Sequence, residues 1–259
     1  MKKILTTFFF LIISLVGLTF YVGVSGVEPV ASLAVSKAHL YGNPDVPIEN
    51  ISLLVLYFVP KDRIGLAVKD WKEFIEPRLK ELQEFHNLQM AGKSKISYEL
   101  YPEIIAGEKK GKEYEINILN HSSPEAIIPV TEEISRRVLK TEGDLYLHSL
   151  HRESEASGAR QVYLIVFEGE GGAGNGNFSL ISRDYLAEDG YKLFGTTFLA
   201  HEFYHTLGLP DNYQQSFYVY GDSQKIPISI LTAEDIMGRV RVPIKNSYID
   251  REILKKMGI

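Results

Sequence analysis

The sequence HEFYHTLGLPD, at residues 201–211, constrains the structure of this chain more than any other stretch. On an α-helix, His201 and His205 are four residues apart, so their imidazole rings project from the same face, one turn apart. Two imidazoles on a rigid helix can hold one zinc ion at about 2.0–2.1 Å each and leave other positions open. Glu202 lies about 100° around the helix from the first histidine and flanks the metal instead of binding it. There it can take a proton from a metal-bound water and pass it to a leaving amine.

The residues that follow this helix predict a third metal ligand. Gly208 ends the helix, because a residue without Cβ turns the chain at low cost, and Pro210 cannot continue it. Asp211 then returns toward the metal as an oxygen ligand. Glu234 is the alternative third ligand, since another class of zinc enzymes uses a Glu well downstream of the helix. The turn at Gly208 favours Asp211, because nothing equivalent orients Glu234.

This segment resembles the metzincin zinc peptidases, whose motif is H-E-x-x-H-x-x-G-x-x-H followed by a Met-turn. The family usually has a third histidine where this chain has Asp211, and the snapalysin-like peptidases are among those that carry Asp there. The resemblance covers about residues 195–240, and the matching positions are His201, Glu202, His205 and Gly208. It implies a zinc-dependent peptidase with one Zn²⁺ per chain and a polypeptide substrate.

The resemblance also assigns roles to residues beyond the motif. It places the Met-turn at residues 235–238, with Met237 as the apolar floor beneath the metal. Some metzincins carry a Tyr two residues after that Met, where this chain has Arg239. The wall of the substrate pocket forms there in metzincins, so Arg239 is expected either to contact an acidic substrate residue or to lie in solvent.

A glycine-rich run at residues 169–177 precedes a short apolar segment. It lacks the G-x-x-x-x-G-K-[ST] pattern of a phosphate-binding loop, so it is interpreted as a flexible connection into an edge strand. Metzincins use such a strand to pair with extended substrate, and by this resemblance Asn177, Ser179 and Ile181 would lie on it and bind the peptide backbone.

Apolar patterns predict an α/β (α+β) fold, and the resemblance implies that it is of the metzincin-like zincin type. Its expected parts are a mixed twisted sheet with an edge strand over the cleft, an active-site helix, a Met-turn and a C-terminal helix. Strands are predicted at residues 51–59, 95–105 and 161–167, the first and last as continuous apolar runs buried on both faces. Helices are predicted at residues 68–88, 124–139 and 247–257 from their spacing and caps.

A proline and several hydroxyl side chains carry further local predictions. Pro77 predicts a kink or break in the first of these helices. Thr196 or Thr197 is expected to cap the helix that carries the histidines, and Ser247 is expected to cap the last helix.

The chain has 259 residues, of which 45% are hydrophobic and 24% charged, as in a folded globular protein. Its net charge of −5 comes without a long basic block, which excludes nucleic acid as an expected partner. Cysteine is absent, so neither disulfides nor thiolate ligands stabilise it. The remaining histidines, His86 among them, lack ligand spacing and are expected at the surface.

Residues 1–26 are predicted to be a signal anchor or a signal peptide. Lys2 and Lys3 precede an uncharged apolar run up to about residue 24, which predicts a cytoplasmic N-terminus and an extracytoplasmic remainder. The run is closer in length to a membrane span than to a cleavable signal, which favours a single-pass anchor; small residues after it leave cleavage and secretion open. Residues 27–50 are predicted to be a linker, and residues 51–259 the catalytic domain.

Together these patterns predict an exported zinc endopeptidase, attached to the membrane through its N-terminal apolar segment. The alternative is a zinc-binding but inactive surface module that recognises other proteins. Glu202 favours the enzyme, because a binding module needs no carboxylate at that position.

Overall fold

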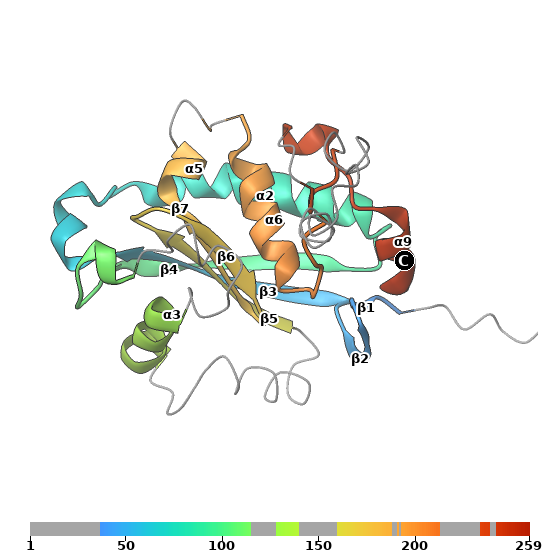
Figure 1. Cartoon of the computed structure of the whole chain (residues 1–259), viewed down its shortest axis with the longest axis horizontal. Coiled ribbons are helices and arrows are strands. Elements are labelled where there is room, and N and C mark those ends of the chain that lie inside the picture. The colour runs from blue at the N-terminus through green and yellow to red at the C-terminus, as the bar shows by residue number, and fades with distance from the viewer. Residues whose placement is uncertain are drawn as a thin grey trace, which may run out of the picture. The chain divides into compact units, whose positions relative to one another are not determined.

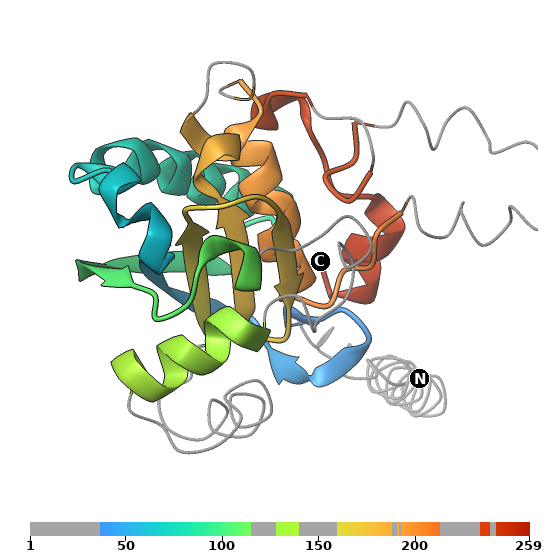
Figure 2. The same cartoon turned by 60° about the vertical axis from the view of Figure 1, so that its left-hand side comes forward.

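A computed structural model describes residues 37–114, 128–139, 160–187, 191, 193–212, 234–238 and 242–259. These residues build a five-stranded sheet with helices on both faces (Figures 1 and 2). The strand order is β4-β3-β5-β7-β6, and within this sheet β6 alone runs antiparallel to its neighbour. The fold is therefore the mixed α/β fold that the apolar patterns predict.

The elements have the following bounds. The strands are β1 (His39–Leu40), β2 (Asn43–Pro47), β3 (Asn50–Val59), β4 (Lys95–Ala106), β5 (Arg160–Phe167), β6 (Gly172–Asn175) and β7 (Phe178–Ser182). The α-helices are α2 (Trp71–Gln89), α3 (Ile128–Ile134), α5 (Arg183–Ala187), α6 (Gly195–His205) and α9 (Arg251–Lys256). Short helical turns are η1 (Lys61–Leu66), η2 (Gly111–Glu113), η4 (Ser135–Leu139) and η6 (Ile244–Asn246).

The central strands β3 and β5 are buried on both faces, as their continuous apolar runs predict. Alternate side chains along a strand point to opposite faces. Leu53 and Val55 accordingly join the core beneath α2 and α6, while Leu56 and Phe58 join a second core on the opposite face. A parallel sheet covered on both faces needs such unbroken apolar strands.

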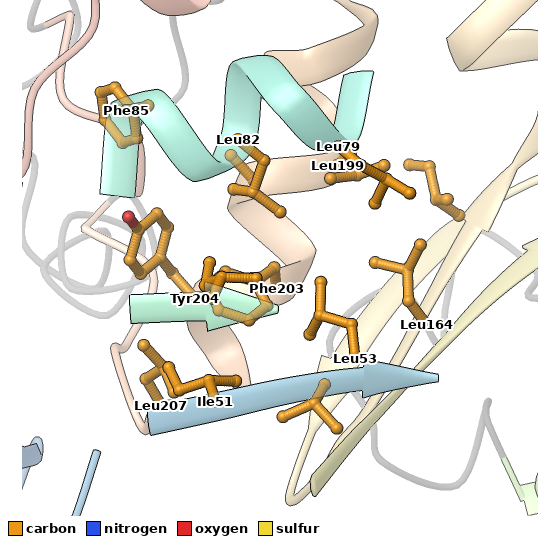
Figure 3. Packing of buried hydrophobic residues seen from close by; sticks show 14 of the residues in the cluster. Ile51, Leu53, Leu79, Leu82, Phe85, Leu164, Leu199, Phe203, Tyr204 and Leu207 are labelled. Carbon is orange, nitrogen blue, oxygen red and sulfur yellow. The ribbon is translucent and has the colours of Figure 1, made fainter. Parts of the chain in front are cut away.

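Helices α2 and α6 pack over one face of the sheet (Figures 1 and 3). Leu79 and Leu82 of α2 contact the same buried cluster as Leu199 and Phe203 of α6. Burying each such side chain contributes about 1.5–3 kcal/mol. Helix α2 continues through Pro77, so of the predicted kink or break the break is wrong, and the kink stays a prediction. Helix α6 thus rests on an apolar base formed by the sheet and α2.

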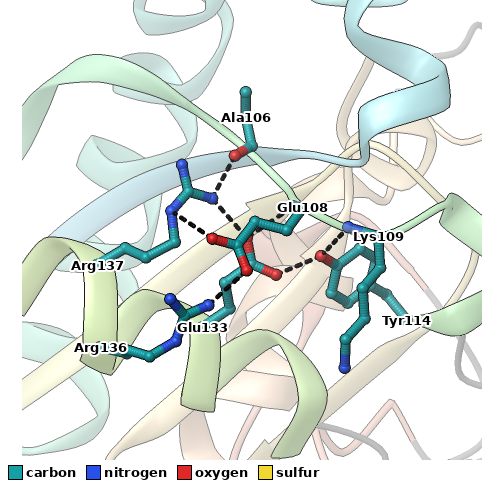
Figure 4. Close-up of polar contacts among 7 residues, drawn as sticks. All are labelled: Ala106, Glu108, Lys109, Tyr114, Glu133, Arg136 and Arg137. Carbon is teal, nitrogen blue, oxygen red and sulfur yellow. Dashed lines mark hydrogen bonds and ion pairs between the residues drawn. The ribbon is translucent and has the colours of Figure 1, made fainter.

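The opposite face of the sheet is covered by α3, which a buried polar network ties to the end of β4 (Figure 4). The Glu133 carboxylate accepts hydrogen bonds from the Tyr114 hydroxyl and, at 2.8 Å, from the Glu108 backbone N–H. Arg137 forms a 2.5 Å ion pair with the same carboxylate. Burial, and next the bond to Glu133, raise the pKa of Tyr114 to about 12, so it remains a donor at neutral pH.

The folded unit begins at Lys37, not at residue 51. Residues 38–48 form the β1–β2 hairpin, whose Leu40 and Ile48 side chains are buried in the main core. The Tyr41 N–H also donates to Leu207 O at 3.0 Å, just after α6. Residues 37–50 therefore belong to the folded unit and not to a linker, and the hairpin contacts the segment that follows α6.

The last helix has a different cap from the one that the sequence predicts. Helix α9 starts after Asp250, whose carboxylate accepts the Glu252 N–H at 2.8 Å, so Asp250 and not Ser247 is the cap. No helix within the described ranges has both the length and the apolar character to cross a membrane. The predicted anchor, residues 1–26, lies outside those ranges.

Candidate active site

Helix α6 presents His201 and His205 on one face, as their spacing predicts. Their ring centroids are 4.8 Å apart with planes at 81°. His201 is buried, with 3% of its side chain exposed, and 17% of the His205 side chain is exposed. The predicted threonine caps are wrong: Thr196 donates to Glu81 on α2, and Thr197 donates to Val242 O at 2.6 Å. These bonds fix the N-terminal end of α6 against its neighbours.

The turn after α6 returns the chain toward the two histidines. Gly208 has a φ of 85°, and its N–H donates to His205 O at 3.0 Å while the Leu209 N–H donates to Tyr204 O at 3.2 Å. This bond pair is the Schellman arrangement, in which a left-handed residue satisfies the last helical carbonyls. A Cβ on Gly208 would also lie 2.8 Å from Tyr41 O. Glycine is therefore required here by both backbone conformation and space.

Asp211 lies where this turn delivers it, against both imidazoles. Its Oδ1 atom is 3.1 Å from His201 Nε2 and 3.3 Å from His205 Nε2. Among the described residues, the group able to hold a metal ion consists of these three side chains, with ligand atoms within 4.8 Å of one another. Glu234, the alternative third ligand, is exposed and does not belong to this cluster.

Hydrogen bonds at the far side of each ring orient the nitrogen atoms. The His201 Nδ1–H group donates to Ile236 O at 2.8 Å, and the His205 Nδ1–H group donates to Leu209 O at 2.9 Å. A carbonyl oxygen only accepts, so in each neutral imidazole the hydrogen sits on Nδ1 and Nε2 offers a lone pair. Such backbone partners are typical of histidines that bind metals.

The donor set fits a zinc ion. Asp211 Oδ1 is buried and has no hydrogen-bond donor among the described residues. Two Nε2 lone pairs and this oxygen therefore point at one another, an arrangement that a cation between them would satisfy. Two imidazoles and one carboxylate are a common zinc ligand set that leaves a further position open.

The electrostatics of the cluster keep the carboxylate ionised. Burial pushes the pKa of Asp211 upward, but protons on His201 and His205, which supply positive charge where a cation would lie, outweigh burial and hold it well below its usual range. Burial lowers the pKa of His205, and the contact with Asp211 and the charge of Glu202 reverse this, so its net shift is upward. A charged carboxylate between two imidazoles favours any positive charge placed there.

Glu202 lies on α6 but outside this ligand cluster. Its side chain is half-buried and extends toward β6, where its Oε1 atom lies 2.8 Å from the position that a Cβ on Gly172 would take. The carboxylate therefore flanks the histidines from the side of the sheet edge. The role of Glu202 beside a metal stays a prediction.

The segment predicted to be a Met-turn lies beside the ligands. Met237 is fully buried, and its carbonyl accepts the Asn212 N–H at 3.0 Å, next to Asp211. The neighbouring Ile236 carbonyl accepts from the His201 ring. The turn thus contacts both the helix and the segment that returns to it. The role of Met237 as the floor of a metal site stays a prediction, and Arg239 lies outside the described residues.

Asp235 and Arg160 connect the segments that surround the candidate site. The sequence analysis did not predict a role for either residue. The Asp235 carboxylate accepts the Met237 N–H at 2.7 Å, the Asp250 N–H at 2.7 Å and the Asn212 amide at 3.0 Å. Arg160 is buried, and its Nη2 donates to Thr206 O and Gly176 O, both at 2.8 Å. It links the C-terminal end of α6 to the β6–β7 turn. The role of Asp235 could have been found from its position two residues before Met237. No local feature of the sequence predicts the role of Arg160.

The predicted edge strand is wrong in position. Strand β7 lies between β5 and β6, and Asn177, Ser179 and Ile181 are all buried, with at most 1% of each residue exposed. Their region pairs with Tyr163 and Leu164 on one side and with β6 on the other, so it cannot add a substrate strand. Among the described strands, the edge next to β7 is instead β6, inside the glycine-rich run that the sequence assigns to a connection.

No protein-family model matches the sequence, and no curated protein matches it. Among solved structures, a catalytically inactive OgpA from Akkermansia muciniphila in complex with an O-glycopeptide substrate has 15% identity and a TM-score of 0.45. That match covers 80% of this chain, which spans 59% of the other. A zinc-dependent peptidase from Methanocorpusculum labreanum has 12% identity and a TM-score of 0.40, over 78% of this chain and 99% of that one. Likenesses this weak leave function to the site residues themselves.

Proposed function

We propose that this chain is a zinc-dependent endopeptidase in which His201, His205 and Asp211 hold one zinc ion and Glu202 is the catalytic base. The observation that supports this proposal is the convergence of two Nε2 atoms on a buried carboxylate oxygen without a hydrogen-bond donor in the described part of the chain. The half-buried carboxylate of Glu202 lies on the same helix, outside the ligand cluster.

Zinc held by these residues would polarise a scissile carbonyl and lower the pKa of an attacking water to about 7. Glu202 removes a proton from that water and delivers it to the amine of the departing product, acting first as base and then as acid. The backbone acceptors Ile236 O and Leu209 O hold both imidazoles in the tautomer that offers Nε2.

Strand β6 is the proposed binding site for the peptide backbone. Its first edge pairs with β7, and no strand of the described ranges pairs with its second edge. Backbone groups at such an edge bind an extended peptide by strand addition. This mode holds the middle of a polypeptide as readily as its end, which supports an endopeptidase.

The full chain and two variants test this function. Wild-type protein loaded with zinc should cleave casein or members of a peptide library. Glu202→Gln should retain stoichiometric zinc and lose about 10²–10⁴-fold in turnover, because the amide cannot accept the proton. His205→Ala should lose most of the zinc. Stoichiometric zinc without turnover of any peptide would favour the inactive recognition module instead.

We also propose that the N-terminal segment exports the chain, on the strength of Lys2 and Lys3 before an apolar run. Fractionation of cells that express the full chain tests this. Protein with an intact N-terminus in the membrane indicates an anchor, and shortened protein outside the cytoplasm indicates a cleaved signal. Full-length protein in the cytoplasm would contradict export.

A further inference from the structure

Strand β6 rests directly on helix α6, beside the residues of the candidate site (Figure 1). Its sequence is Gly-Ala-Gly-Asn, and such a composition is unusual for a strand because glycine loses most backbone freedom and adds no packing. Neither Gly172 nor Gly174 has a positive φ. Backbone conformation therefore does not explain why these positions are glycine, and the space around them does.

Gly174 allows the strand to touch the backbone of the helix. A Cβ at this position would lie 1.9 Å from the carbonyl oxygen of Glu202 and 2.9 Å from the Cβ of His205. The first distance is far shorter than any non-bonded contact, and a helical carbonyl cannot move away without breaking the helix. Any side chain at residue 174 would therefore push the edge strand off the helix.

Gly172 leaves room for the Glu202 side chain. A Cβ here would lie 2.8 Å from Glu202 Oε1 and 3.3 Å from both its Cδ and its Cγ. These atoms belong to a flexible side chain, so a methyl group at residue 172 would displace the carboxylate and leave the backbone in place. The position of the carboxylate is thus set partly by the absence of a side chain on the facing strand.

We infer that Gly172 and Gly174 are positioning residues: Gly172 reserves the space in which Glu202 holds its carboxylate, and Gly174 fixes the distance between the edge strand and the active-site helix. This inference rests on the proposed role of Glu202. The strand proposed to bind the peptide and the helix that carries the base are then in contact without an intervening side chain. The distance between a peptide bound to β6 and the Glu202 carboxylate is then set by the backbones of β6 and α6, which move less than side chains do.

Gly172→Ala in the full chain tests the inference. Because a misplacement of about 1 Å can cost about 10²-fold in rate, we expect kcat to fall by about 10–100-fold. KM, zinc stoichiometry and Tm should stay close to those of the parent, since only the carboxylate is displaced. A crystal structure of the variant should show Glu202 moved from its place in the parent. Gly65→Ala is the matched control, because no atom of the described residues lies within 4 Å of its new Cβ.

Gly174→Ala should behave differently, because its clash is with backbone. We expect a lower Tm and changes in both kcat and KM, as the strand moves off the helix. Combining Gly172→Ala with Glu202→Gln should lower kcat no further than Glu202→Gln alone, since both act through one carboxylate.

The outcomes separate this inference from the proposed function. An unmoved Glu202 carboxylate in Gly172→Ala overturns the inference, and so does an unchanged kcat where Glu202→Gln has lost turnover. Full turnover in Glu202→Gln overturns the proposed function instead. If no peptide is cleaved by the parent, the crystal structures still decide whether Gly172 positions Glu202.

Discussion

Two backbone carbonyls determine which nitrogen of each site histidine faces Asp211. Because Ile236 O and Leu209 O each engage an Nδ1–H group, both Nε2 atoms lie within 3.3 Å of the same carboxylate oxygen. The carboxylate is buried, so its charge is poorly screened by water. At the scale of single residues, the site is therefore organised for a cation before any ligand enters it.

Removal of the Asp211 carboxylate should weaken zinc binding more than removal of the carboxylate of Glu234, the alternative third ligand. Altering the outer partners of a metal site typically costs about 10–100-fold in affinity, so loss of a direct ligand in Asp211→Ala should cost at least that. Glu234→Ala, an exposed position, should leave the zinc dissociation constant unchanged. Competition titration with a zinc chelator measures both. Equal affinities for Asp211→Ala and the parent would exclude Asp211 as a ligand.

Among the elements, the turn at residues 235–238 is bonded to two neighbouring segments through the Asp235 side chain. Asp235 is 3% exposed, and its carboxylate accepts from the turn itself, from Asn212 beside Asp211, and from Asp250 at the start of α9. A carboxylate two residues before the buried Met thus fixes the turn, the segment that carries Asp211 and the last helix relative to one another.

Loss of this carboxylate should destabilise the protein. A buried donor left without an acceptor costs about 1–3 kcal/mol, so Asp235→Ala should lower the free energy of unfolding by at least about 2 kcal/mol. Asp235→Asn keeps one oxygen acceptor and should show a smaller loss. Urea denaturation at neutral pH measures both variants against the parent. A free energy of unfolding in Asp235→Ala equal to that of the parent would show that the turn is held by other contacts.

At the scale of the whole molecule, elements that carry a strong apolar pattern could be predicted from sequence. Strands β3, β4 and β5 lie where expected: β3 and β5 are continuous apolar runs, as burial on both faces requires, and β4 alternates in sequence. The helix with the histidines lies where the spacing of its motif predicts. The edge strand could not be predicted, because glycine has a low strand propensity. The glycines of β6 are explained by the lack of space beside Glu202, which the sequence does not reveal. The β1–β2 hairpin was also not predicted. Its few apolar residues are buried against segments that lie far away in the sequence.

The burial of His86 could not be predicted either, because its two hydrogen-bond partners are far apart in the sequence. His86 is fully buried, and its Nε2–H donates to Ser94 Oγ at 2.8 Å, while its Nδ1 accepts from the Tyr204 hydroxyl at 3.2 Å. The expectation of a surface histidine at this position is therefore wrong. Burial lowers the pKa of His86 from 6.5 to about 3, so the ring is neutral in the folded protein at neutral pH.

His86 should make folding stability depend on pH. Below pH 6.5 the unfolded chain binds a proton at this residue and the folded protein does not, until the pH nears 3. Its contribution to stability is thus complete above pH 6.5 and is lost as the pH falls, at about 1.4 kcal/mol per pH unit. His86→Gln cannot titrate, so its urea unfolding free energy should fall less steeply from pH 6 to 4. Identical slopes in the variant and the parent would contradict a neutral buried imidazole.

The zinc site itself is tested by a crystal structure of the zinc-loaded full chain, with anomalous diffraction recorded at the zinc edge. One anomalous peak per chain is expected, at about 2.0–2.2 Å from His201 Nε2, His205 Nε2 and a carboxylate oxygen of Asp211. A peak at other residues, or none at these three in crystals that contain stoichiometric zinc, would contradict the assignment.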